Sequence, residues 1–260
     1  VRAVTRQLAA GQFRLYQTEA SFGYEGGLPP ILLTLPGGRQ VTLRGRIDRI
    51  DRYDAPNATY LRVIDYKSSD NDLEATKMWW GLQLQLLLYL DAAMALSPEA
   101  RPAGAFYFHV QNPLVQTDAD VQAVVEDELR KRLMLKGVTL SDVTVLRAMD
   151  GGDIPVVQKN VLDKQGEPTS DAPAFTEPQL RQLMAHARAM ATRLSEAIFT
   201  GGIAIAPAMT GGEPACDRCD YKGVCGLSPQ EDENLLRPIE KLEMAELKAR
   251  LSQGETDIVP

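Results

Sequence analysis

The stretches GRIDRID at residues 45–51 and VIDYK at residues 63–67 decide which fold we expect for this chain. Both contain β-branched residues, as is typical of strands, and a turn-forming DAPN segment lies between them. Side chains on a strand alternate between its two faces, so Asp65 and Lys67 point the same way. Asp48, on the preceding strand, can lie beside them across the turn. The sequence therefore predicts two carboxylates and a lysine on one face of a sheet.

This set of side chains suits the hydrolysis of a phosphodiester bond. Carboxylates are the hard oxygen ligands that Mg²⁺ prefers, and a bound metal polarises a phosphoryl group and lowers the pKa of its water. The alternative is that Asp48, Asp51 and Asp65 are ordinary turn-flanking or salt-bridged acids. Asp65 and Lys67 end an apolar run, where an unpaired buried charge costs several kcal/mol, and this favours a paired or metal-bound site.

Outside these strands the chain alternates further strands with helices, which favours an α/β fold with a central sheet. We find no linker that would split the chain, so residues 1–260 are expected to form one domain. The pattern predicts strands at 12–20, 31–35, 40–51, 60–67, 104–110 and 154–158, and helices up to residue 11 and at 78–96, 119–136, 177–199 and 237–251.

Composition excludes several classes of protein. With 44% hydrophobic and 24% charged residues, the chain is not a disordered protein, a collagen or a disulfide-rich toxin. The net charge of −7 means that contact with nucleic acid has to come from a local patch. No apolar run is long enough to cross a membrane and no signal peptide is present at residue 1, so we expect a cytoplasmic protein without a membrane partner.

The three cysteines, Cys216, Cys219 and Cys225, follow a Gly/Pro-rich loop with the spacing C-x2-C-x5-C. Such close thiols indicate a metal or cluster site more than a disulfide. Zinc and iron–sulfur sites normally take four ligands, so the three cysteines leave such a site one ligand short. The alternatives are three free thiols, or a zinc site completed by Asp217 or Asp220.

Taken together, these motifs resemble the PD-(D/E)XK nucleases of the RecB type, and in particular the C-terminal nuclease domain of the AddB-type family. Gly-x-x-Asp at 45–48, Asp-x-Lys at 65–67, Gln-x-x-x-Tyr at 85–89 and the cysteine trio occur in that family's order. The similarity runs from about residue 12 to residue 240. It implies a restriction-endonuclease-like fold, a central mixed sheet flanked by helices, with a C-terminal iron–sulfur-binding extension. That extension comprises the cysteine-cluster loop at 201–230 and a tail helix at 231–260.

The resemblance assigns roles to the residues around the paired acids. Asp48, Asp65 and the backbone carbonyl of Tyr66 would bind Mg²⁺, and Lys67 would be the catalytic lysine. The helix that follows would add two more catalytic side chains, which hold the DNA strand or the lysine. These are Gln85 and Tyr89, which share one helix face at i and i+4.

Several of the residues around the site have a second possible role. Gln85 and Tyr89 could instead satisfy only each other, and Gln83 should be structural. Arg46 and Arg52 have the strand parity of Asp48, so they could line the cleft and bind DNA phosphates, or be solvated charges on an edge strand. Nearby, Arg44 and Arg49 add to this basic cluster, and Glu19 resembles an acid that recurs near the start of the family's domain.

Two ligands of the family are missing from this chain. The family takes a further metal ligand, often His, from a helix before the Gly-x-x-Asp strand, whereas His109 and His186 both follow Asp48. We expect His109 to be a core residue and His186 a surface or packing residue. The family also holds a 4Fe-4S cluster with one cysteine before the nuclease core and three after it. Both missing ligands would lie upstream of Val1, in a larger protein.

The resemblance implies a Mg²⁺-dependent exonuclease that acts on single-stranded DNA, on the strand with the 5′ end. Its partner would be an AddA-type helicase–nuclease subunit, and the complex would act in double-strand break repair by homologous recombination. One alternative is another RecB-like or CRISPR-associated exonuclease. The other is a non-catalytic module that binds DNA ends, against which the intact Asp48, Asp65 and Lys67 argue.

Overall fold

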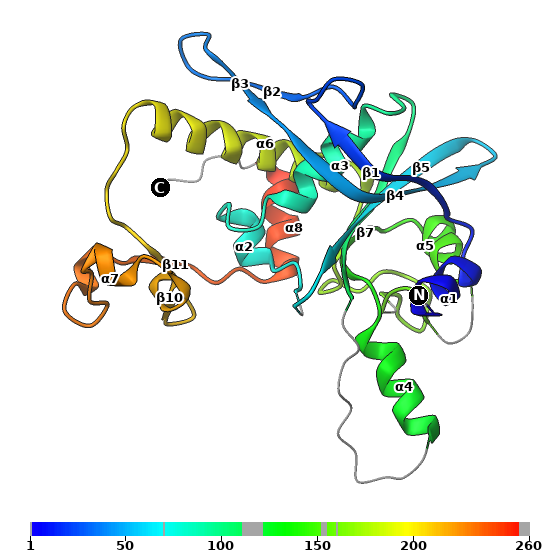
Figure 1. Ribbon diagram of the computed structural model, residues 1–260. Helices are drawn as coiled ribbons and strands as arrows, with labels where there is room; N and C mark the ends of the chain where they lie inside the picture. The colour runs from blue at the N-terminus through cyan, green and yellow to red at the C-terminus, as the bar shows by residue number, and fades with distance from the viewer. Residues whose placement is uncertain (1, 70, 111–121, 152–154, 160, 255–260) are drawn as a thin grey trace.

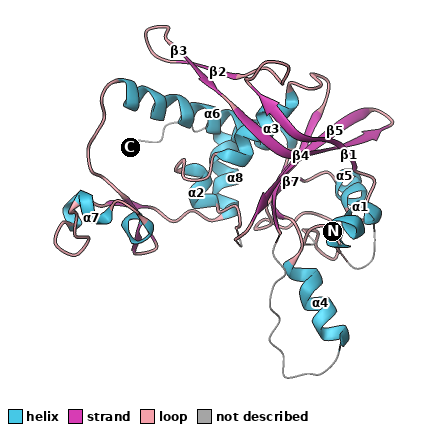
Figure 2. Cartoon of the chain, viewed as in Figure 1, coloured by secondary structure: helices cyan, strands magenta, loops and turns pink. Residues whose placement is uncertain are grey.

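A central six-stranded sheet organises the computed structural model, which describes residues 2–69, 71–110, 122–151, 155–159 and 161–254 (Figures 1 and 2). Its order is β1-β4-β5-β6-β7-β8, with β5 parallel to β6 and β7 parallel to β8, while the other neighbours are antiparallel. The expected mixed sheet is therefore confirmed. The strands are β1 (Arg14–Phe22), β4 (Gly45–Ala55), β5 (Ala58–Lys67), β6 (Arg101–His109), β7 (Lys136–Leu140) and β8 (Ala174–Phe175).

Helices cover both faces of this sheet, as Figure 1 shows. One face packs against α2 (Ala75–Trp79), α3 (Gln85–Met94), α6 (Glu177–Phe199) and α8 (Met244–Gln253) through the larger apolar core. The other face packs against α1 (Arg2–Ala10) and α5 (Val143–Met149) through a second core. The alternation on β6 sets these faces apart, because Ala105 and Tyr107 enter the first core and Phe106 and Phe108 enter the second.

The longest helix, α6, has the predicted bounds because local signals define its start. Thr176 caps it, and its side chain and that of Gln179 form reciprocal hydrogen bonds with the backbone N–H groups of the first turn. Pro178 lies in the first turn, where its missing N–H is tolerated. The predicted strands at 12–20, 31–35, 60–67 and 104–110 and the helix up to residue 11 are also confirmed, within a few residues at their ends.

Two predicted elements are wrong because each is two elements. Residues 40–51 divide into β3 (Gln40–Leu43), which pairs with β2 (Ile31–Thr34) in a separate hairpin, and β4 in the main sheet. Residues 78–96 divide into α2 and α3, because the backbone at Gly81 adopts φ +77° and ends the first helix. At Gly81 the apolar pattern does not reveal the break, since buried residues of α2 and α3 lie on both sides of it.

The C-terminal part also differs from the prediction. The predicted helix at 237–251 begins only at α8, because Pro238 belongs to β11 (Arg237–Ile239), which pairs with β9 (Ala208–Thr210). The tail helix expected within 231–260 is α8, and residues 255–260 lie outside the described part. The loop at 201–214 also contains β10 (Glu213–Pro214), and the cysteines follow in η1 (Ala215–Arg218) and α7 (Lys222–Cys225).

The two remaining predictions fall partly on residues that are not described. The helix predicted at 119–136 is α4 (Gln122–Arg132), with residues 119–121 outside the described part. The strand predicted at 154–158 is wrong where it can be seen, because within residues 155–158 only Gln158 forms a bridge, an isolated one to Leu135.

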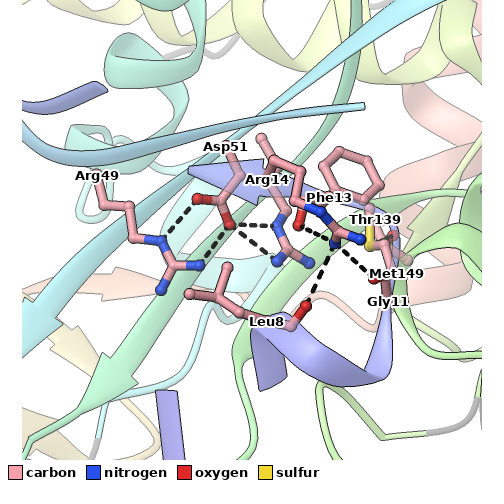
Figure 3. Close-up of polar contacts among 9 residues, drawn as sticks. Leu8, Gly11, Phe13, Arg14, Arg49, Asp51, Thr139 and Met149 are labelled. Carbon is pink, nitrogen blue, oxygen red and sulfur yellow. Dashed lines mark hydrogen bonds and ion pairs between the residues drawn. The ribbon is translucent and has the colours of Figure 1, made fainter. Parts of the chain in front are cut away.

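A cluster of buried charges joins β4 to β5. Arg49 donates two hydrogen bonds of 2.7 Å to the carboxylate of Asp51 (Figure 3), and Nε of Arg62 donates a third of 3.0 Å. All three side chains are almost fully buried, and Arg62 also lies over the ring of Phe13 at 4.6 Å. Arg49 is therefore not part of the basic surface cluster expected near the paired acids. Burial lowers the pKa of Arg49, but the hydrogen bonds and charge of Asp51, together with Tyr66, outweigh this and raise the pKa, so the guanidinium stays charged.

We predict that Asp51→Asn lowers the free energy of unfolding by about 3–5 kcal/mol, because it removes the carboxylate to which two buried guanidinium groups are bonded. The matched control is Asp54→Asn on the same strand, whose exposed carboxylate pairs with Arg52, and which should leave stability nearly unchanged. Denaturant unfolding of the two variants and the parent checks this. Equal stability of both variants would contradict a structural role for the cluster.

Candidate active site

The paired acids and the lysine meet where β4 begins and β5 ends. Asp48 accepts a hydrogen bond of 2.8 Å at Oδ2 from the backbone N–H of Tyr66. Nζ of Lys67 lies 2.7 Å from Oδ2 of Asp65 on the same strand. The antiparallel register of β4 and β5, in which Arg49 faces Ile64, places Asp48 next to Asp65. The structure thus brings together the three residues that the sequence placed on one sheet face.

Asp65 is a buried carboxylate in an unfavourable environment. Its residue is 4% exposed, and burial raises its pKa, as does the charge of Asp48, while Lys67 lowers it. Among the described residues, none donates a well-directed hydrogen bond to its Oδ2, although Lys67 is in ion-pair contact with it. Two neighbouring carboxylates, one of them buried with a raised pKa, fit a divalent cation, because a hard cation is stabilised by such oxygen ligands.

Helix α3 adds two side chains to the site. Oε1 of Gln85 accepts a hydrogen bond of 3.0 Å from Nζ of Lys67, and Nε2 of Gln85 donates one of 3.0 Å to the hydroxyl of Tyr89. Gln85 and Tyr89 therefore do not satisfy only each other, since Gln85 also contacts the lysine, and their catalytic role stays a prediction. Gly45 leaves room for the ring of Phe22, which would lie 2.7 Å from a Cβ at this position.

Sequence reasoning missed Tyr107, which lies beneath the lysine. Its ring centroid is 5.7 Å from Nζ of Lys67, and its backbone faces Asp65 across the parallel β5–β6 pair. Burial, with the nearby charge of Asp65, raises the pKa of Tyr107 to about 12, so the phenol stays neutral. His109, expected in the core, is only half-buried and contacts the carbonyl of Ser68 at the same end of the sheet. Only the pairing of β5 with β6 could have located these residues.

The two arginines assigned to DNA are not equally close to the site. Arg46 precedes Asp48 on β4 and pairs with Glu19 at 2.8 Å, both side chains being exposed. Arg52 belongs to the other end of β4, where it pairs with Asp54 and lies over the ring of Tyr16. Of these two arginines, only Arg46 therefore lies at the end of β4 that carries Asp48.

Two other residues have structural roles. Gln83 binds the backbone between β5 and α2 through its side-chain amide, as expected, with the N–H of Glu74 and the carbonyl of Asp72 as partners. His186 is a packing residue, since it is 2% exposed and stacks on Trp79 at 4.6 Å.

The cysteine-bearing segment lies apart from the central sheet in Figure 1. Cys216 is half-buried, Cys219 and Cys225 are exposed, and all three thiols are free. Within the described residues, no three His, Cys, Asp or Glu side chains converge to hold a metal ion. The cysteines therefore do not form a complete cluster site, and the zinc alternative with Asp217 or Asp220 is not formed either.

No described helix is both long and apolar enough to pass through a membrane.

Known proteins resemble this chain over most of its length. The model of the PD-(D/E)XK nuclease superfamily matches residues 1–226. The chain is 32% identical over 262 residues to the B subunit of the ATP-dependent helicase/deoxyribonuclease of Alkaliphilus oremlandii, covering 98% of this chain and 23% of that protein. It is 41% identical over 228 residues to the protein of the same name from Moorella thermoacetica, covering 85% of this chain and 20% of that protein. It is also 39% identical over 258 residues to the protein of the same name from Symbiobacterium thermophilum, and this match covers 95% of the present chain and 22% of that protein. The chain thus spans about a fifth of the length of these relatives.

We predict that Mg²⁺ raises the melting temperature of this chain and that Asp65→Asn removes this effect. Because burial disfavours the charged form of Asp65, the variant should also melt higher than the parent in a chelator. At a Mg²⁺ concentration ten times Kd, the expected stabilisation of the parent is about 1.4 kcal/mol. Differential scanning calorimetry with and without Mg²⁺ measures both effects. Asp54→Asn should keep the Mg²⁺ effect, and an equal effect in Asp65→Asn would exclude Asp65 as a ligand.

Proposed function

Because the chain belongs to the PD-(D/E)XK nuclease superfamily, we propose that it is the nuclease domain of a helicase–deoxyribonuclease complex and hydrolyses phosphodiester bonds of single-stranded DNA with Mg²⁺. The observation that carries this proposal is the contact of Lys67 with both Asp65 and Gln85 beside Asp48. The printed names of the relatives, which call them deoxyribonuclease subunits, support the same activity.

The residues that would hold Mg²⁺ are the carboxylates of Asp48 and Asp65 and the backbone carbonyl of Tyr66. A bound ion supplies Lewis-acid polarisation of the phosphoryl group. The protein orients these ligands in advance, because the N–H of Tyr66 fixes one oxygen of Asp48 and the ammonium of Lys67 fixes one of Asp65. Such preorganisation lowers the reorganisation needed when the substrate binds.

Lys67 supplies the positive charge of the site. Its ammonium offsets the two carboxylates and, being about one-third exposed, can also reach a phosphoryl oxygen. Gln85 takes one of the three N–H groups of the ammonium and so restricts its direction. Tyr89 in turn orients Gln85. In this proposal Gln85 and Tyr89 hold the lysine, and the exposed Arg46 binds a phosphate of the entering strand.

The substrate and assembly follow from the family resemblance together with charge. A net charge of −7 gives the chain little attraction for DNA of its own. A domain that receives strands already unwound by a helicase needs little such attraction. We therefore propose that it works in complex with an AddA-type subunit, degrades the strand with the 5′ end, and serves double-strand break repair by homologous recombination.

We predict that the protein cleaves a labelled single-stranded oligonucleotide only with Mg²⁺, and that Asp65→Ala and Lys67→Ala each lower kcat by about 10²–10³. Loss of an oriented ligand or of the positive charge removes stabilisation that develops in the transition state. Quenched-flow assays with 5′- and 3′-labelled strands measure the rate and the polarity. Asp54→Asn should cleave like the parent.

Three results would count against the proposal. Equal cleavage by the parent and Asp65→Ala would remove the catalytic assignment, and cleavage in a chelator would remove the requirement for Mg²⁺. Release of short products from the 3′ end first would reverse the proposed polarity.

The same proposal includes a 4Fe-4S cluster held by Cys216, Cys219, Cys225 and a fourth cysteine that is not among the residues of this chain. The motif supports it, because three closely spaced thiols supply most of a four-thiolate site. In this proposal the cluster takes no part in the hydrolysis, and among the described residues the three thiols do not converge.

We predict that the chain of 260 residues alone does not retain a stable cluster after anaerobic reconstitution, because a thiolate ligand is missing. The longer protein should show the visible charge-transfer absorption of a thiolate-bound cluster, and Cys219→Ser in it should remove that absorption. Absorption spectra and iron analysis measure both. A stable four-iron cluster in the chain alone would overturn the requirement for a fourth cysteine.

A further inference from the structure

We propose that Tyr107 is a positioning residue for the proposed reaction, and that its ring holds the ammonium of Lys67 in its place between Asp65 and Gln85. This inference rests on the proposed function for its catalytic consequence, but its structural part can be tested without activity. Tyr107 lies outside the motifs that assign roles to Asp48, Asp65, Lys67, Gln85 and Tyr89.

The placement of Tyr107 follows from the parallel pairing of β5 and β6. Tyr107 faces Asp65 in the register, and its neighbour Phe108 faces Tyr66. Because side chains alternate on each strand, Tyr107 shares the sheet face of Asp65 and Lys67. The residue is 7% exposed, and it is packed in the same core as the helices that cover this face.

The ring supplies an attraction that the polar contacts of Lys67 do not. Nζ of Lys67 is held by Asp65 at 2.7 Å and Gln85 at 3.0 Å, and the Tyr107 centroid lies 5.7 Å away. A cation within about 6 Å of an aromatic face is attracted by the ring quadrupole. The ring is itself fixed by burial, whereas the lysine stem is flexible. Tyr107 therefore provides a rigid aromatic ring that restricts the position of the ammonium.

This role requires the ring of Tyr107 and not its hydroxyl. Tyr107→Phe should therefore preserve the position of Lys67, and Tyr107→Leu should lose it. Phe106→Leu is the matched control, because Phe106 is the adjacent aromatic residue of β6, is 1% exposed, and belongs to the core of the opposite sheet face. It removes an equally buried ring without touching the lysine.

The first test reads the position of Lys67 directly. Biosynthetic incorporation of ¹³C-lysine labels the lysine side chains of the full chain without altering their N–H groups, and Lys67→Arg identifies the Lys67 signal by its loss. In ¹H–¹³C spectra the ε-CH2 group of Lys67 should be shifted upfield by the ring in the parent, in Tyr107→Phe and in Phe106→Leu. In Tyr107→Leu the signal should move to the position of exposed lysines. An unchanged Lys67 signal in Tyr107→Leu would overturn the proposal.

The second test reads the consequence for the reaction. Tyr107→Leu should lower kcat by about ten- to hundredfold with KM nearly unchanged, because a misplaced catalytic group slows the chemical step. Tyr107→Phe and Phe106→Leu should retain the parent kcat. A shifted Lys67 signal with unchanged kcat would overturn the catalytic part. An inactive parent with the predicted spectra would refute the proposed nuclease function and leave the positioning of Lys67 established.

Discussion

The carboxylate of Asp51, buried between the guanidinium groups of Arg49 and Arg62, is the interaction on which the geometry of the sheet depends. Removing three charged groups from water is costly, so they are stable only while they bond to one another. Asp51 faces Arg62 directly in the β4–β5 register, and a shift by one residue would separate them. The same register places Asp48 beside Asp65 on the opposite face. A purely structural ion cluster thus fixes the candidate active site.

The site itself is built at a cost to stability. Asp65 carries a raised pKa because it is buried next to another carboxylate, and Lys67 offsets its charge. Lys67 is in turn held by a glutamine, and that glutamine by a tyrosine on the same helix. Such an arrangement is typical of sites where function takes precedence over stability. The needs of the site also explain why β5 and α3, which otherwise pack against the apolar core, carry the polar residues Asp65, Lys67 and Gln85.

The errors of the sequence-based prediction have physical causes that particular residues illustrate. Gly81 divides a continuous apolar run into α2 and α3, and that division sets the start of the helix that carries Gln85. Pro238 belongs to a short strand that pairs with a segment about thirty residues earlier, so the charged pattern around it is not a helix. Arg49 and Arg52 belong to the same basic stretch in the sequence. One is buried against Asp51 and the other is paired with Asp54 at the far end of the strand.

Features that depend on neighbouring residues could be read from the sequence alone. These are the alternation that puts Asp65 with Lys67, the spacing that puts Gln85 with Tyr89, and the start of α6 near Pro178. The fold was needed to show that Asp51 is buried between two arginines whereas Asp48 and Asp65 lie beside Lys67, since the three aspartates occur in similar sequence patterns. It was also needed to place Tyr107, because the pairing of β5 with β6 joins strands separated by two helices. Which side chains share a face of one strand or helix follows from the repeat of that element, whereas the pairing of β5 with β6 depends on packing between segments distant in the sequence.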